Sequence, residues 1–217
     1  MGFFPKGKLY DRNRLLSAAA KAQSRKRFKK ALALYEEVVR AEPNNPELHR
    51  KLAPLLARRK QRERAWRSFR FAAEALVNGG FYEKAIGVYR EAAHYLPRQI
   101  TAWLAIAELH VHRERRSSAV EALLQGRSNF RRRKHRPEAI RLLARAREID
   151  PAHFEVNLDL ARLLSRTRSR AMARRILAEL APHCHRGQLV RLRAAQFRLS
   201  PTPAAVLRWL RALVAGH

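Results

Sequence analysis

The sequence has 217 residues, 47% of them apolar, so it can fold around a sizeable core. Forty-seven Lys and Arg residues oppose 18 Asp and Glu residues, and the net charge of +29 favours a polyanionic partner. No stretch of about 18 residues is apolar without charge, which argues against a transmembrane helix. The N-terminus lacks the apolar segment of a signal peptide. A single cysteine, Cys184, allows no internal disulfide, so we expect a cytoplasmic protein.

Helical periodicity begins after an N-terminal extension, residues 1–10, and continues to the end of the chain. Apolar and small residues recur three and four apart, as in Ala31, Leu34 and Val38. Between the breaks, apolar and polar residues do not alternate in the way that predicts a β-strand. The pattern predicts about eleven or twelve helices and more than about 70% helix. The breaks fall at short Pro-, Gly- or Asn-containing signals, at 42–46, 78–80, 96–97, 150–151 and 200–203.

One spacing of small and apolar residues occurs six times. A small residue is followed four positions later by a large apolar one and three positions after that by another apolar or small one. The small residues, which we treat as structural anchors, are Ala31, Ala65, Ala85, Ala119, Ala139 and Ala173. Their separations are 34, 20, 34, 20 and 34 residues, which indicates an internal repeat.

The spacing resembles the tetratricopeptide repeat over about residues 12–182. Units that start at 46, 100 and 154 carry the expected apolar and small pair on their first helix: Leu52 and Ala53, Ile106 and Ala107, Leu160 and Ala161. Bulky side chains at the small positions would hold crossing helices apart, so we expect these three alanines to be buried. The resemblance implies an all-α, right-handed helical-repeat solenoid that binds another protein.

The 20-residue separations depart from the plain family pattern, because each leaves room for only one helix and a turn. The helices near 63–78 and 117–131 should therefore close one repeat and open the next, with helices packed on both sides. This gives 54-residue super-repeats at 46–99 and 100–153, inside a solenoid that covers 11–182.

The pattern fails after about residue 183, where helices at 187–199 and 203–215 are expected to cap the solenoid as a segment 183–217. We predict that one face of the last helix docks on the final repeat, with Trp209 at its edge. That face consists of Leu207, Leu210, Leu213 and Val214. A partner-binding or membrane-surface helix is the alternative.

No catalytic, cofactor or metal site is predicted, and we do not expect an enzyme. Phosphate-binding glycine loops and the HExxH metalloprotease motif are absent from the sequence. His183-Cys184-His185 cannot direct three adjacent side chains at one ion, and we interpret it as a turn. The family's clamp for a partner's carboxylate is also missing, since Leu16 and Ala20 stand at the corresponding first-repeat positions.

Basic residues concentrate in the turns that precede four of the anchors. The seven-residue segments that begin at Ser24, Arg58, His112 and Arg166 carry net charges of +5, +4, +2 and +3. Because such turns recur at equivalent places in a stacked array, we predict one cationic edge. Its candidate polyanion- or partner-binding residues are Arg25, Lys26, Arg27, Arg58, Arg59, Lys60, Arg62, Arg115, Arg116, Arg132, Arg133, Arg166 and Arg168.

These observations favour a non-enzymatic interaction scaffold or adaptor whose cationic edge binds an acidic protein. A nucleic-acid-associated adaptor that binds phosphates is the alternative. Readers of single strands place aromatic side chains among their arginines, and here only Phe28 and Phe130 do so. A peripheral membrane anchor is least favoured. The Arg and Ala content can also reflect GC-rich coding.

Overall fold

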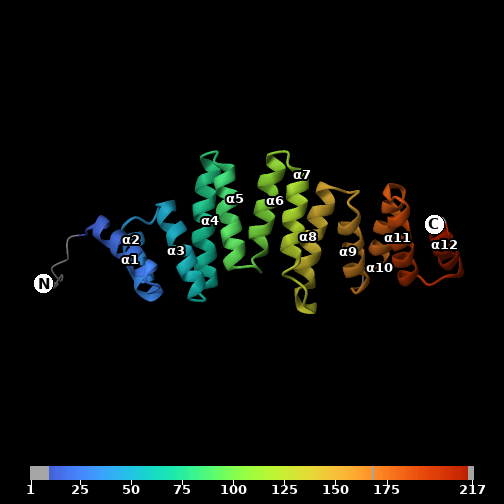
Figure 1. Ribbon diagram of the computed structural model, residues 1–217, viewed down its shortest axis with the longest axis horizontal. Helices are drawn as coiled ribbons and strands as arrows, with labels where there is room; N and C mark the ends of the chain where they lie inside the picture. The colour runs from blue at the N-terminus through green and yellow to red at the C-terminus, as the bar shows by residue number, and fades with distance from the viewer. Residues whose placement is uncertain (1–9, 168, 215–217) are drawn as a thin grey trace. The chain divides into compact units, whose positions relative to one another are not determined.

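The computed structural model describes residues 10–167 and 169–214, with side chains for 10–167 and 169–211. These residues form twelve α-helices and two short 3₁₀ helices, with no strand among them (Figure 1). With 81% of the described residues in helices, the fold is an all-α helical-repeat solenoid, as the sequence predicts. It divides into two compact units, residues 1–102 and 103–217, which are described separately.

The first unit contains five helices, each packed against the next along the chain. Asn45 begins the third helix, because its side-chain oxygen accepts hydrogen bonds from the backbone N–H groups of Glu47 and Leu48. Asp11 caps the first helix in the same way. The helices are α1 (Arg12–Ser24), α2 (Phe28–Ala41), α3 (Pro46–Arg58), α4 (Arg62–Asn78) and α5 (Tyr82–Tyr95).

The second unit contains the rest of the chain. Its first helix, α6 (Ile100–His112), starts within the last residues of the first unit. The others are α7 (Arg116–Arg127), α8 (Arg136–Ile149), α9 (Phe154–Ser165), α10 (Arg170–Leu180), α11 (Arg186–Leu199) and α12 (Pro203–Val214). The short 3₁₀ helices precede α8 and α11 at Arg133–His135 and Ala181–His183.

Small residues lie where the sequence places the helix crossings. Ala53 and Ala107 are 0% exposed and Ala161 is 1% exposed, which confirms their expected burial. All six anchor alanines are also fully buried. The core therefore follows the 34- and 20-residue spacing through both units.

The two helices that were expected to serve adjacent repeats have neighbours on both sides. Helix α4 packs against α3 and α5. Helix α7 packs against α8, and its Gly126 lies directly against Trp103 of α6. The neighbours of these two helices agree with the expected packing, and the 54-residue super-repeats stay a prediction.

Helix α7 is shorter than the predicted 117–131, because it ends at Arg127. The Asn129 side chain donates to the carbonyl oxygens of Gln125 and Gly126, which satisfies acceptors at the helix end. Phe130 then turns into the core, where it is 3% exposed. A local side-chain cap and one buried ring thus end the helix before the basic run.

The docking face predicted for the last helix is wrong where the structure describes it. Leu207 is 55% exposed and Leu210 is 46% exposed, whereas Ala205 is buried. Trp209 stacks on Phe197 of α11 at a centroid distance of 6.1 Å, so a different stripe of α12 faces α11. The side chains of Leu213 and Val214 lie outside the described residues. No helix in the described part of the chain is both long and apolar enough to cross a membrane.

Candidate functional site

One backbone turn recurs between helices and sets the positions of the basic residues. In it, a residue in the left-handed region is followed by an N–H that bonds to the carbonyl five residues back, which is a Schellman cap. The left-handed residues are Lys26, Lys60, Gly80 and Glu114, with φ of 57°, 61°, 75° and 59°. The closing bonds run from Arg27 to Ala22, Gln61 to Leu56, Phe81 to Leu76 and Arg115 to His110. Because the four turns share this backbone geometry, residues at the same position in each turn lie at the same place relative to the helix ends.

In the first unit, the α1–α2 and α3–α4 turns lie at the same end of the helices. Arg58, the last residue of α3, links them because its guanidinium lies 4.9 Å from the ring centroid of Phe28, the first residue of α2. The same guanidinium lies 5.5 Å from the Tyr95 ring at the end of α5. We call the basic residues of these two turns the N-terminal cationic cluster: Arg25, Lys26, Arg27, Arg58, Arg59, Lys60 and Arg62.

The N-terminal cationic cluster lacks acidic counterparts. None of its seven side chains forms an ion pair with an Asp or Glu among the described residues, and all seven are exposed. Acidic side chains of this unit pair elsewhere: Glu36 with Arg64 at 2.7 Å and Glu42 with Arg12 at 2.8 Å. The positive charge of the turns is thus left facing solvent.

In the second unit, the segment between α7 and α8 lies beside the α9–α10 turn. The guanidinium Nη1 of Arg136 donates to the carbonyl oxygen of Arg166 at 2.9 Å. This contact brings together residues 30 positions apart. We call the group the C-terminal cationic cluster: Arg131, Arg132, Arg133, Lys134, Arg136 and Arg166. Arg168 lies outside the described residues.

The prediction of a single edge is wrong for Arg115 and Arg116. Arg116 begins α7, whereas Arg132 and Arg133 follow its end, and twelve residues of helix separate the two ends by about 18 Å (Figure 1). The reason is that α7 lies between the two groups, because the α6–α7 turn is at its start and the basic segment 131–136 follows its end. Sequence spacing found the equivalent turns but did not follow the direction of the chain.

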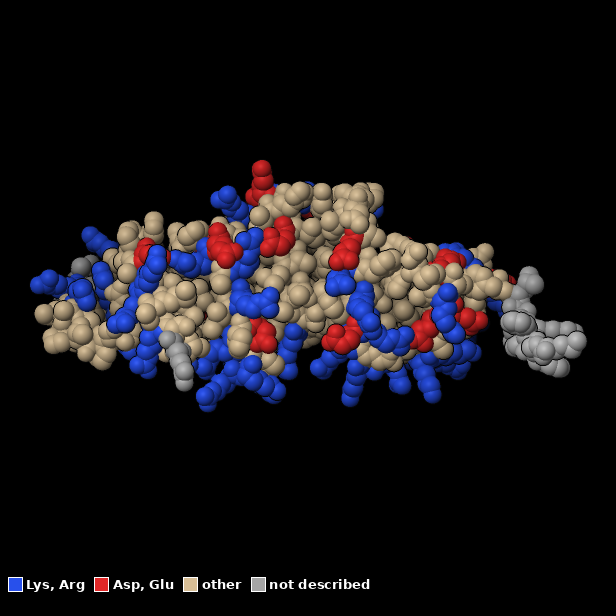
Figure 2. Space-filling model, turned by 180° about the vertical axis from the view of Figure 1, so that it is seen from behind, with Lys and Arg blue, Asp and Glu red and all other residues tan. Residues whose placement is uncertain are grey.

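Several arginines on the helix faces of the second unit differ from those in the turns, because they pair with acidic side chains. Arg145 binds Glu108 of α6 through Nε and Nη2 at 2.7 and 2.8 Å. These bonds, with another to Glu148, raise the pKa of the Arg145 guanidinium above its usual value. Arg127 similarly pairs with Asp159 at 2.7 Å. In Figure 2, Lys and Arg side chains also project from each unit in groups with little acidic surface between them.

The aromatic residues among the basic clusters are few, and each is either buried or already in contact with a cationic side chain. Phe28 has the Arg58 guanidinium over its ring, and Phe130 is buried at 3% exposure. Phe81, which is 54% exposed, belongs to the α4–α5 turn and has Lys84 Nζ 4.7 Å from its centroid. The clusters therefore offer charge and hydrogen-bond donors rather than free ring faces.

The residues that looked metal-like in sequence have structural roles. The Cys184 thiol donates to the carbonyl oxygen of Leu180, and burial raises its pKa. His185 and Gln188 form a reciprocal cap at the start of α11. The segment is a helix-to-helix turn, as interpreted from the sequence.

The fold and the recurring turn define a protein of the helical-repeat class. Residues 130–196 match the family model described as the tetratricopeptide repeat, which confirms the resemblance found in the spacing. Repeats of this family generally mediate protein–protein interaction. No curated protein sequence matches the chain.

Solved structures of low sequence identity are similar to the chain. MamA from Desulfovibrio magneticus is 16% identical, with 81% of this chain and 97% of that chain covered and a TM-score of 0.29. A tetratricopeptide repeat protein from Parabacteroides merdae is 15% identical, with 95% and 93% covered and a TM-score of 0.30. The human IFIT1 dimer is 19% identical, with 94% and 51% covered and a TM-score of 0.34. None of these likenesses bears on the partner of this chain.

Proposed function

We propose that this protein is a non-enzymatic interaction scaffold whose cationic turns bind an acidic protein. The observation that carries the proposal is the unpaired state of the N-terminal cationic cluster within the described residues, whereas helix-face arginines such as Arg64, Arg127 and Arg145 have acidic partners. Like charges so close together repel one another, and an anionic partner would relieve that repulsion. A cytoplasmic location accompanies the proposal, since the lone Cys184 can form no internal disulfide.

A protein is favoured over a nucleic acid as the partner because of the aromatic residues. Base stacking on exposed rings contributes much of the binding of single strands. Phe28 is covered by Arg58, and Phe130 is buried. Guanidinium groups, in contrast, bind carboxylates bidentately without help from rings. The alternative nucleic-acid adaptor would have to rely on phosphate contacts alone.

The test uses the full chain with two polyanions, poly-glutamate and an oligouridylate of similar charge. We expect poly-glutamate to bind the more tightly, with an affinity that falls as salt rises from about 0.05 to 0.3 M because the contacts are electrostatic. Capture of cellular partners with and without nuclease should give the same proteins. Tighter binding of the oligouridylate, or partners that disappear with nuclease, would favour the alternative.

Paired charge reversals distinguish binding at the N-terminal cationic cluster from a general effect of the protein's net charge. Arg59→Glu with Arg62→Glu should weaken poly-glutamate binding about tenfold or more, because both exposed side chains lie in the N-terminal cationic cluster. Arg208→Glu with Arg211→Glu makes the same charge change on α12, and we expect less than a threefold effect. Equal losses in the two variants would contradict a defined binding surface. Circular dichroism checks that both variants keep their helices.

A further inference from the structure

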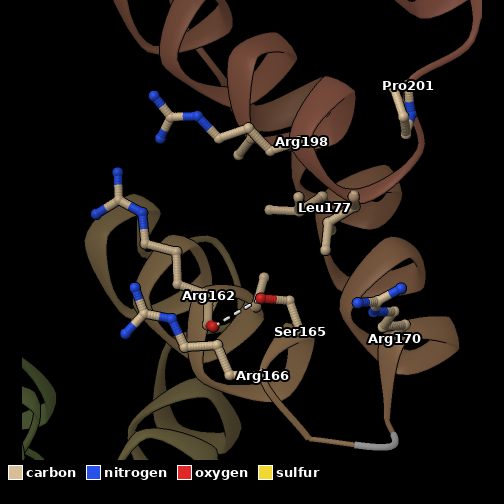
Figure 3. A pocket seen from close by; sticks show the side chains of 10 residues that line it. Arg162, Ser165, Arg166, Arg170, Leu177, Arg198 and Pro201 are labelled. Carbon is tan, nitrogen blue, oxygen red and sulfur yellow. Dashed lines mark hydrogen bonds between the residues drawn. The ribbon is translucent and has the colours of Figure 1, made fainter.

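A cavity of about 500 Å³ lies between α9, α10 and α11 of the second unit, and four arginines surround it (Figure 3). Arg162 and Arg166 come from the end of α9, Arg170 from the start of α10 and Arg198 from the end of α11. The side chains of Arg162, Arg166 and Arg198 extend to one side of the cavity, and Arg170 stands on the opposite side (Figure 3). No Asp or Glu is among the described residues that line it.

All four guanidinium groups are available to a ligand. Their residues are exposed, and none pairs with an acidic side chain in the described part of the chain. The backbone rather than the side chain of Arg166 makes the contact with Arg136. Four free guanidinium groups around one opening favour a ligand with at least two negative charges, held through bidentate hydrogen bonds.

The lining other than the arginines, which we call the floor, has a different chemistry. It consists of the apolar Ala161, Leu177, Ala195, Leu199 and Pro201, with Ser165, whose hydroxyl donates to the carbonyl oxygen of Arg162. A volume of about 500 Å³ far exceeds that of one inorganic ion and lies in the range of sites that enclose an organic group. None of the described residues that line the cavity is aromatic, so these residues offer a base no ring to stack on.

We propose that this cavity binds an acidic peptide segment, with one apolar side chain on the floor and flanking carboxylates on the arginines. The inference rests on the proposed function, since it names the part of an acidic partner that this unit recognises. The cationic clusters would supply general attraction, whereas the cavity would supply selectivity for an apolar residue between acids. Charge complementarity selects the flanking residues, and volume and aliphatic lining select the central one.

The test compares two fluorescent peptides of equal charge, in which four glutamates flank either one leucine or one serine. We expect the full chain to bind the leucine peptide about tenfold more tightly, because burying a leucine side chain favours binding by roughly that factor. Ala195→Phe fills the floor without changing charge. It should reduce this preference to less than about twofold and leave the serine peptide's affinity unchanged. If Ala195→Phe loses helical signal, Ala195→Leu replaces it in the same assay.

A matched pair of arginine variants separates the cavity from the clusters. Arg162→Ala with Arg198→Ala should weaken the leucine peptide about tenfold, while Arg59→Ala with Arg62→Ala should weaken both peptides equally and keep the preference. Equal binding of both peptides by the wild-type chain, or an unchanged preference in a folded Ala195 variant, would overturn the cavity proposal. Failure of both peptides and of poly-glutamate to bind would instead overturn the proposed function.

Discussion

Gly126 of α7 lies against the indole of Trp103, so closely that an added Cβ would stand 2.6 Å from the Trp103 Cγ. The Trp103 Cβ and Cδ2 would each be 2.9 Å away. Trp103 is itself only 6% exposed, so the ring has little room to withdraw. Glycine at this position therefore permits α6 and α7 to approach, and its lack of a side chain is a packing requirement.

We expect Gly126→Ala to destabilise the protein by about 1–3 kcal/mol, because the new methyl group must displace a packed indole. Gly87→Ala is the control, since a Cβ at this glycine of α5 would meet nothing within 4 Å. There, alanine should stabilise the helix by about 0.5–1 kcal/mol. Denaturant unfolding followed by circular dichroism measures both. A neutral result for Gly126→Ala would mean that α6 and α7 are not packed this closely.

A substitution at a left-handed turn residue can raise the stability of the fold while it removes a charge from the turn. Lys60 has a φ of 61°, a conformation that costs a side-chain-bearing residue about 1–2 kcal/mol. Lys60→Gly removes that cost but adds entropy to the unfolded chain, so we expect a net gain of about 0.5–1 kcal/mol. The same variant removes one charge from the N-terminal cationic cluster and should weaken poly-glutamate binding.

The opposite substitution in the equivalent turn provides the control. Gly80 has a φ of 75°, and a Cβ there would meet nothing within 4 Å. Gly80→Ala should therefore destabilise by about 1 kcal/mol through backbone conformation alone. Thermal melts of the two variants that shifted in the same direction would contradict this account of the turn.

The sequence was sufficient for the fold because its signal is repeated. Six small residues at fixed separations each mark a helix contact, so a departure from the pattern in one repeat does not obscure it. The local ends were less predictable. Asn129 ends α7 through side-chain bonds to Gln125 and Gly126, an interaction that no periodicity encodes.

The candidate site was only partly predictable from sequence. The sequence directly gives the charge of each turn. It does not give which turns lie next to one another, because that depends on the direction in which each helix runs. Arg136 and Arg166 meet across 30 positions, a contact that the repeat spacing alone does not reveal. The cavity with Arg198 likewise requires α11, which lies beyond the repeats where the spacing had already failed.

The carboxylate of Glu42 gives a pH-dependent prediction. It accepts hydrogen bonds from Asn45 Nδ2 and Tyr10 OH, both at 3.0 Å, and pairs with Arg12 at 2.8 Å. The bond from Asn45, with help from Tyr10 and Arg12 and against desolvation, lowers the pKa of Glu42. A carboxyl whose pKa is lower in the folded state stabilises it above the unfolded pKa, and this contribution is lost as pH falls through the folded pKa.

Replacing Glu42 should therefore flatten the acid side of the stability profile. We expect Glu42→Gln to lower the melting temperature near neutral pH and to lose less stability than the wild type between about pH 6 and 3. Glu37→Gln is the control, because that exposed carboxylate has no hydrogen bond or ion pair in the described part of the chain. Parallel profiles for wild type and Glu42→Gln would show that the cluster around Glu42 contributes nothing to folding.

Because α7 carries different arginines at its two ends, its position predicts which arginines of the second unit act together. Arg132 and Arg133 belong to the C-terminal cationic cluster beside Arg166, whereas Arg116 begins the same helix at its other end. Arg132→Glu with Arg133→Glu should weaken poly-glutamate binding about tenfold, because the new carboxylates would repel the anionic ligand held by the rest of the C-terminal cationic cluster.

The control is Arg115→Glu with Arg116→Glu, which makes the same change in net charge about 18 Å away. We expect it to weaken binding less than threefold at about 0.15 M salt, because the Debye length there is only about 8 Å. Fluorescence anisotropy at that salt concentration measures both variants. Equal weakening would mean that the ligand responds to total charge, and the separate clusters would then have no binding role of their own.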